Sequence, residues 1–166
     1  MSAPILILGV DPGLQRCGWG LVACEGVRLS HIAHGVVAPP RDAALAQRLA
    51  ALLQGLSEVI AAHRPDQAAV EETFVNANAR AALALGQARG VALAACAQAG
   101  LPVGEYAPAV IKKAVVGAGH AQKEQVAFMV RRLLPAAGAV SADAADALAA
   151  ALCHAAYGAF RRKAGA

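Results

Sequence analysis

A short apolar run close to the N-terminus, residues 5–10, ends abruptly at Asp11, which is followed by a Pro-Gly pair. Ile, Leu and Val dominate the run, which favours a buried β-strand, and Pro-Gly favours a turn directly after it. Two more apolar stretches, 17–24 and 27–37, are separated by a Glu-Gly pair and predict a hairpin. A chain that opens with three strands is expected to build its fold around a sheet.

The rest of the chain alternates helical and strand-like patterns. Leucines recur at helical spacing between Leu45 and Ile60; Asp42 can cap this helix, and Pro65 follows its end. Further along we predict strands at 67–72 and 101–105, and helices from about 81 to 99 and at 108–116, 122–134 and 141–160. This order predicts an α/β fold with a mixed sheet flanked by helices. In such sheets, functional sites gather at the carboxyl ends of strands.

Four acidic residues stand at unusual places in this pattern. Asp143 and Asp146 are three residues apart in an otherwise apolar helix, so their carboxylates share one helical face. Asp11 and Glu71 each follow an apolar strand. Like charges in apolar surroundings are costly to ionise, and a divalent cation held by oxygen ligands would offset that cost. Together the four acids predict a metal site assembled by folding.

Three of the four acids also have an ordinary explanation, whereas Asp146 lies one turn further into its helix, where the helix dipole no longer explains it. Asp143 follows Ser141, a good N-cap, and acids in a first helical turn complement the helix dipole. Asp11 belongs to Asp-Pro-Gly, a common turn sequence. Glu71 is followed by Glu72, and alternation alone does not choose between them. Only the combination of the four acids favours a functional site.

Composition narrows the class of protein. At 166 residues the chain is expected to form a single domain spanning 1–166, with a basic C-terminal tail at about 161–166. Hydrophobic content is 58%, much of it alanine, which favours closely packed helices. No apolar run reaches the roughly 18 residues that would span a membrane, and no signal peptide is expected. Four widely spaced cysteines are expected to be buried free thiols in a reducing cytosol, which predicts a cytoplasmic protein.

Charge adds a hint about partners. The net charge is +4 and the isoelectric point is near 9.1, which is consistent with a nucleic-acid partner. Lys112, Lys123 and their neighbour Lys113 flank a glycine-rich stretch, although lysines on a solvated helix face are the ordinary alternative. In the helix before them, Gly86 and Gly90 would let another helix approach closely, from the same chain or from a partner subunit.

Five segments, in this order, resemble one known family. They are Gly9-Val-Asp-Pro-Gly13 with Gly18-Trp-Gly20, Ala69-Val-Glu71-x-x-Phe74, Leu85-Gly-Gln-Ala-Arg-Gly-Val91, Lys112-x-x-Val-Val-Gly-x-Gly119, and Asp143-Ala-Ala-Asp-Ala-Leu148. The pattern is similar to that of the RuvC family of Holliday-junction resolvases, from about residue 5 to 157. Single segments are weak, since Asp-x-Gly after a strand also occurs in actin-like ATPases and sugar kinases.

The resemblance implies a ribonuclease H-like fold with a five-stranded mixed sheet, a homodimer, and an endodeoxyribonuclease that resolves four-way DNA junctions in recombination and repair. It implies that Asp11, Glu71, Asp143 and Asp146 are the metal ligands and catalytic acids. Glu71 is preferred over Glu72 because the motif's glutamate lies three residues before its Phe. Lys112 and Lys123 resemble basic catalytic residues at the rim of the site.

Four carboxylates suit two Mg²⁺ ions per site, with Mn²⁺ as the expected substitute. Such ions would activate a water for attack on a phosphodiester and stabilise the departing 3′ oxygen, leaving 5′-phosphate and 3′-hydroxyl ends. Asp11 is our choice to bridge both ions.

Further contacts with DNA are expected around the site. Phe74 could anchor the core or stack on an unpaired base at the crossover. Asn76, Asn78, Arg80 and Lys113 are candidate contacts to the DNA backbone. The resemblance also implies the branch-migration proteins RuvA and RuvB as partners. Two competing hypotheses are an actin-like nucleotide-binding ATPase and a junction-binding protein without catalytic activity.

Overall fold

The structure is a computed structural model that describes residues 3–72 and 78–164, with side chains described as far as Gly158. Its strands are β1 (Ile5–Asp11), β2 (Cys17–Glu25), β3 (Arg28–Val37), β4 (Gln67–Glu71) and β5 (Val103–Tyr106). Its helices are α1 (Leu45–His63), α2 (Ala79–Gln98), α3 (Pro108–Val116), α4 (Lys123–Leu133) and α5 (Ala142–Ala164), with a short 3-10 turn, η1 (Pro135–Ala137).

The strands form one five-stranded mixed sheet in the order β3-β2-β1-β4-β5. β1, β2 and β3 are antiparallel neighbours, whereas β4 pairs parallel with both β1 and β5. The hairpin and the mixed sheet predicted from the sequence are therefore confirmed. Because β1 and β4 run in parallel, their carboxyl ends meet at the same edge of the sheet, where Asp11 and Glu71 lie.

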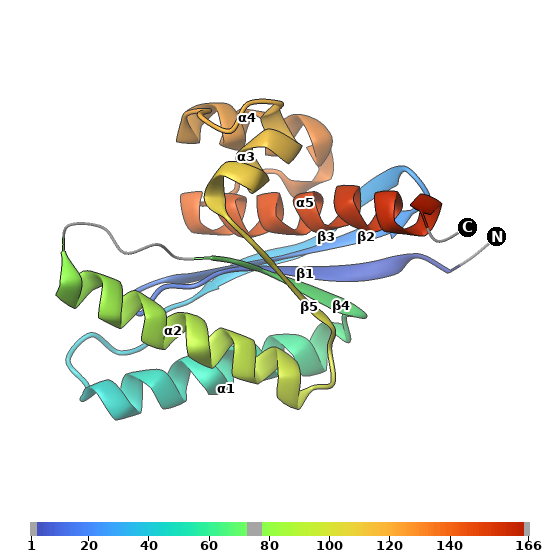
Figure 1. Ribbon diagram of the computed structural model, residues 1–166. Coiled ribbons are helices and arrows are strands. Elements are labelled where there is room, and N and C mark those ends of the chain that lie inside the picture. Colours follow the sequence, from blue (N-terminus) through green and yellow to red (C-terminus); the bar gives the residue numbers. More distant parts are fainter. Residues whose placement is uncertain (1–2, 73–77, 165–166) are drawn as a thin grey trace.

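Helices cover both faces of the sheet (Figure 1). α1 and α2 lie on one face, where the leucine stripe of α1 buries Leu52, Leu56 and Ile60. α5 lies on the other face, with α3 and α4 packed outside it. Because α5 is squeezed between two layers, it is buried around most of its circumference, and its many alanines allow that close contact.

Two glycines of the sheet let α5 approach unusually closely. A Cβ placed on Gly9 of β1 would lie 1.8 Å from the carbonyl oxygen of Ala147, and one on Gly18 of β2 would lie 2.0 Å from that of Asp143. No side chain larger than hydrogen fits at either position while the helix backbone stays where it is. The two glycines thereby fix the height of α5 above the strand that ends in Asp11.

The structure corrects some details of the sequence prediction. Asp42 does not cap α1, which begins at Leu45 with Ala44 as its N-cap and no side-chain capping bond. β5 spans Val103–Tyr106, so it begins two residues later and ends one residue later than the predicted strand at 101–105. The four cysteines are buried and free, as predicted. Among the described helices, none has the length and apolar character needed to cross a membrane.

Candidate active site

The site begins where two strands of the sheet end. β1 and β4 pair in a register that places Val10 beside Val70, so the next residues, Asp11 and Glu71, are neighbours at the carboxyl edge. Both carboxyl groups are largely shielded from water, and they hydrogen-bond to each other. The rule that parallel strands bring their carboxyl ends together therefore holds for the first two predicted acids.

The first turns of α5 bring the other two acids over the same edge. Ser141 Oγ accepts a hydrogen bond of 3.3 Å from the backbone N–H of Ala144, which fixes the start of the helix. Asp143 lies in the first turn, and Asp146 lies one turn further along the same face. The capped end of α5 is the part of the helix nearest to the strand ends. Asp143 can therefore have the ordinary role of an acid in a first helical turn and still lie near Asp11.

A hollow of about 210 Å³ lies between these elements. Five elements each contribute one charged residue to its lining, namely Asp11, Glu71, Lys112, Lys123 and Asp146. The apolar part of its wall is formed by α3, α4 and α5. The structure therefore gathers three of the four predicted acids and both predicted rim lysines around one hollow.

The carboxylates in the hollow strongly perturb one another. Burial, followed by the charges of Glu71 and Asp146, raises the pKa of Asp11 to about 8. Burial also raises the pKa of Glu71 and of Asp146, although Lys123 opposes the rise at both. In return, the carboxylate of Asp146 raises the pKa of Lys123. Clusters of titratable groups perturbed in this way are typical of functional sites.

The two acids of α5 are paired with different cations. Lys123 Nζ lies 3.5 Å from Asp146 Oδ2, whereas Arg16 Nε donates a hydrogen bond of 2.7 Å to Asp143 Oδ2. Asp143 therefore faces a neighbouring groove rather than the hollow, although its charge still contributes to the raised pKa of Asp11. The sequence predicted that the two acids share a face but did not predict that their side chains divide between two cations.

Comparison with known proteins places this geometry in context. The family profile described as "Crossover junction endodeoxyribonuclease RuvC" matches residues 7–154. The chain belongs to the RuvC family. A relative with the same description from Hyphomonas neptunium is 55% identical over 100% of this chain and 99% of its own length, and one from a Caulobacter species is 58% identical over 92% and 90%.

The solved structures give the same assignment. The RuvC of Thermus thermophilus in complex with a Holliday junction substrate is 36% identical, with a TM-score of 0.85, over 95% of this chain and 96% of that one. The fold of the present chain is therefore that of the RuvC family, the ribonuclease H-like arrangement that the sequence resemblance implied.

The fit of a divalent cation depends on the donors present. As the described side chains lie, no three His, Cys, Asp or Glu residues form a group that could hold a metal ion. In this arrangement Asp11 shares a hydrogen bond with Glu71, while Lys123 and Arg16 pair with the acids of α5. The donors are nevertheless carboxylate oxygens, and burial together with the neighbouring acids raises the pKa of one of them, Asp11, to about 8. Such a set suits an oxygen-seeking divalent cation of the kind expected for a RuvC-family site.

The remaining predicted DNA contacts differ in their settings. Lys113 is exposed on α3 and does not line the hollow. Asn78 is the N-cap of α2, and its side chain accepts a hydrogen bond of 3.1 Å from the N–H of Ala81, which is a structural role that the sequence reading missed. Arg80 is exposed in the first turn of α2. Phe74 and Asn76 lie outside the described residues.

Arg16 is the residue near the site that sequence reasoning overlooked. It lies between the Asp-Pro-Gly turn and Gly18, and its partner Asp143 is 127 residues away in the sequence. The signal available was a lone arginine placed between two motif segments that both converge on the site. A pattern of that kind identifies a residue near the acids but not the acid it pairs with.

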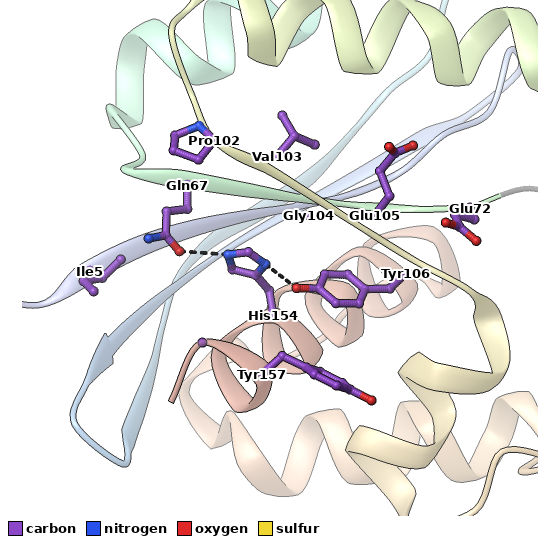
Figure 2. Close-up of a pocket in the computed structure, with 11 residues that line it drawn as sticks. Ile5, Gln67, Glu72, Pro102, Val103, Gly104, Glu105, Tyr106, His154 and Tyr157 are labelled. Atoms are coloured by element: carbon purple, nitrogen blue, oxygen red, sulfur yellow. Dashed lines mark hydrogen bonds between the residues drawn. The ribbon is translucent and has the colours of Figure 1, made fainter. Parts of the chain in front are cut away.

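A larger hollow, of about 730 Å³, lies at the free edge of β5 (Figure 2). Three of its lining residues form a chain of hydrogen bonds, in which His154 Nε2 lies 2.8 Å from Gln67 Oε1 and His154 Nδ1 lies 2.7 Å from the Tyr106 hydroxyl. Of the two acids that line it, Glu72 and Glu105, Glu105 pairs with Arg89. The four acids predicted from the sequence do not line this larger hollow.

The raised pKa of Asp11 predicts how the stability of metal-free protein depends on pH. An unfolded aspartate ionises near pH 4, whereas the folded one keeps its proton up to about pH 8. The folded state therefore binds an extra proton between these values, and stability falls as pH rises through that window. In a chelator, we expect the Asp11→Asn protein to melt several degrees above wild type at pH 8.5, since about 1 kcal/mol corresponds to roughly 2–4 °C for a chain of this size.

The difference should shrink towards pH 4. Other groups titrate in the same range, so the quantity to measure is the difference in melting temperature between variant and wild type at each pH. Equal melting temperatures for the two proteins at pH 8.5 would contradict a crowded, protonated Asp11.

Proposed function

We propose that this chain is a metal-dependent endonuclease that resolves four-way DNA junctions by paired, symmetric nicks, acting in recombination and DNA repair. The observation that carries the proposal is the set of three carboxylates around one hollow, where burial, followed by the charges of Glu71 and Asp146, raises the pKa of Asp11 to about 8. Membership of the RuvC family supports the substrate, because the related RuvC of Thermus thermophilus is described in complex with a Holliday junction.

We assign the metal to the four acids. Asp11 is central, between the strand neighbour Glu71 and the helix acid Asp146, and would bridge two ions, while Asp143 would complete the set by turning away from Arg16. Mg²⁺ bound there, with Mn²⁺ as a substitute, would supply an activated water and stabilisation of the departing 3′ oxygen, giving a 5′-phosphate and a 3′-hydroxyl.

The basic residues act on the phosphates. Lys112 and Lys123 approach the hollow from α3 and α4, on the side opposite the strand ends. A lysine is a compact cation that can hold a phosphate oxygen and neutralise charge that develops on it. We propose that Lys123 exchanges Asp146 for a phosphate when DNA binds. Phe74 is proposed to stack at the crossover, with Asn76, Arg80 and Lys113 as contacts to the backbone; Asn78 would act chiefly by capping α2.

A nicking assay tests this function. The protein is incubated with a synthetic four-way junction and Mg²⁺, and with a linear duplex of the same sequence as control. Paired nicks at symmetric positions, with ends that a ligase can seal, are the expected result. Junction binding without nicks in any divalent metal would favour a binding protein without catalytic activity. Turnover of ATP without nicks would favour the actin-like alternative.

We propose further that the protein acts as a homodimer, since a four-way junction offers two equivalent strands and a two-fold axis places one site on each. α2 is our candidate for the interface. Its inner face packs on α1. Outside the adjoining stretch of α2 itself, no described atom lies within 4 Å of a Cβ built on Gly86 or Gly90, so none of the other described helices uses these glycines. On the same outer face Leu83 is 65% exposed. A partner subunit remains the predicted occupant.

A substitution at Gly90 tests dimerisation without destabilising the fold of the single subunit. Leu is a better helix former than Gly by up to about 1 kcal/mol, so Gly90→Leu should keep or slightly raise the stability of each subunit. Its side chain should nevertheless keep two α2 helices apart and convert paired cuts into single nicks. Sedimentation gives the oligomeric state, and Gly90→Ala is a milder control. A Gly90→Leu protein that sediments as a dimer and cuts in pairs would remove α2 from the interface.

Two further assignments follow from the resemblance. We propose that the branch-migration proteins RuvA and RuvB are partners, and that the protein works in the cytoplasm, where bacterial DNA lies. Co-purification with each partner on a four-way junction would test the first of these assignments.

A further inference from the structure

The ion pair between Arg16 and Asp143 has no evident role in holding the fold. The side chains are 49% and 31% exposed, and an ion pair in such a setting contributes little to stability. The helix start that carries Asp143 is already fixed by the Ser141 cap and by the close contact at Gly18. The pair nevertheless occupies an acid that the family resemblance makes a metal ligand.

Arg16 also lines a groove beside the acid site. This groove, of about 480 Å³, lies between the segment 13–16, α1 and the first turns of α2, and Asp143 forms its border with the acids. A second arginine, Arg48 of α1, lines it as well. Arg48 Nη2 donates a hydrogen bond of 3.1 Å to the carbonyl of Leu14 and so holds the segment that carries Arg16. Within the described part of the chain, the buried Nε of Arg48 has no hydrogen-bond partner.

The charges in this groove are out of balance. Among the described residues, two guanidinium groups and one carboxylate, that of Asp143, line it. Guanidinium groups bind phosphate through several N–H donors at once, so an uncompensated pair favours a phosphodiester. Lys112 and Lys123 lie on the other side of the acids. A DNA strand crossing the acids would then meet cations on both flanks.

Which cation pairs with the Asp143 carboxylate, Arg16 or a metal ion, decides how strongly the groove attracts an anion. Without metal, Asp143 neutralises the charge of Arg16, so Arg48 carries the one uncompensated charge among the described side chains of the groove. When Asp143 gives its charge to a metal ion, that neutralisation is lost, and the groove gains positive potential next to the scissile position. Any phosphate that holds Arg16 away from Asp143 frees the acid in turn. By thermodynamic linkage, metal and DNA must then strengthen each other's binding by the same factor.

We propose that Arg16 is an exchangeable partner that couples metal binding to DNA binding: it pairs with Asp143 in the metal-free protein and with a backbone phosphate in the Arg16–Arg48 groove when metal and junction are bound. The inference rests on the proposed junction-cutting function but concerns binding alone. Its test therefore measures binding rather than cutting.

The test compares wild type with Arg16→Ala. Calorimetry with Mn²⁺ gives metal affinity without DNA, and gel-shift titrations give junction affinity in chelator and in Ca²⁺, which prefers the same oxygen ligands. For wild type we expect Ca²⁺ to tighten junction binding by a factor in the range of about 5–150. For Arg16→Ala we expect tighter Mn²⁺ binding and a Ca²⁺ factor smaller than that of wild type, because only the neutralisation of the acids remains. We also expect a salt dependence in Ca²⁺ that is shallower by about 0.9 in log–log slope.

Arg28→Ala is the matched control, since it removes one exposed arginine at the start of β3, away from both hollows. It should keep the wild-type metal affinity and the full Ca²⁺ effect. The proposal is overturned if Arg16→Ala keeps the wild-type Ca²⁺ factor, or if it lowers the melting temperature while leaving Mn²⁺ affinity unchanged, as a purely structural residue would. A wild type that binds no junction in either condition would overturn the proposed function as well.

Discussion

Asp146→Asn should cut four-way junctions slower than wild type by about 10²–10³-fold or more while binding them at least as tightly in the absence of metal. Asn keeps the shape of the side chain but removes a charged ligand from the hollow shared with Asp11 and Glu71. DNA is held through its phosphates by cations, so an acid in the site repels the junction until metal neutralises it. Removing one negative charge also frees Lys123, which lies 3.5 Å from Asp146 Oδ2, for a phosphate.

The stability of this variant should hold or rise, because repulsion among the carboxylates of the metal-free site is relieved. Single-turnover nicking with Mg²⁺, gel-shift titration in a chelator and a melting curve measure the three effects separately. Glu72→Gln is the matched control. This substitution removes a charge from the residue next to Glu71, but Glu72 lines the larger hollow at β5 rather than the acid site. The Glu72→Gln protein should therefore cut at the wild-type rate. An Asp146→Asn protein that cuts at close to the wild-type rate would contradict the assignment of a metal site to these acids.

Local patterns predicted this fold well because the informative residues act through the backbone. The Glu-Gly hairpin, the strand before Asp11 and the strand before Glu71 are short-range signals, and the register of β1 with β4 turns them into neighbours. The pairing of Asp11 with Glu71 needed only the knowledge that two parallel strands end at one edge. The failure at Asp42 is also local, since an acid two residues too early for the observed N-cap, Ala44, contributes no capping bond.

The parts that the sequence could not supply depend on side chains meeting across long sequence separations. That Asp143 and Asp146 share a helical face follows from their spacing, but their division between Arg16 and Lys123 does not. Helical periodicity says nothing about which cation a neighbouring loop presents. The same limit applies to Gly86 and Gly90: spacing predicted a close approach, and only the packed fold shows that α1 contacts the opposite face of α2.

Gly9→Ala is expected to be the most damaging of the small substitutions in this protein. The added Cβ would lie 1.8 Å from the carbonyl oxygen of Ala147 and 2.9 Å from the backbone nitrogen of Ala151, and neither backbone atom can move without the helix. α5 is packed between the sheet and the outer helices, so it has no free side toward which to shift. Overpacking of this kind costs about 1–3 kcal/mol or more, and the melting temperature should fall by about 6 °C or more.

The folded fraction should also cut poorly, because any displacement of α5 carries Asp146 away from Asp11. Gly158→Ala is the matched control: it adds the same methyl group to α5 itself, at a position with no described atom within 4 Å of the new Cβ, and should stabilise the helix by up to about 1 kcal/mol. Melting curves and Mn²⁺ calorimetry on both variants separate loss of fold from loss of the site. A Gly9→Ala protein with wild-type melting temperature and metal affinity would show that α5 does not contact β1 as closely as described. The described arrangement of Asp146 over Asp11 would then be wrong.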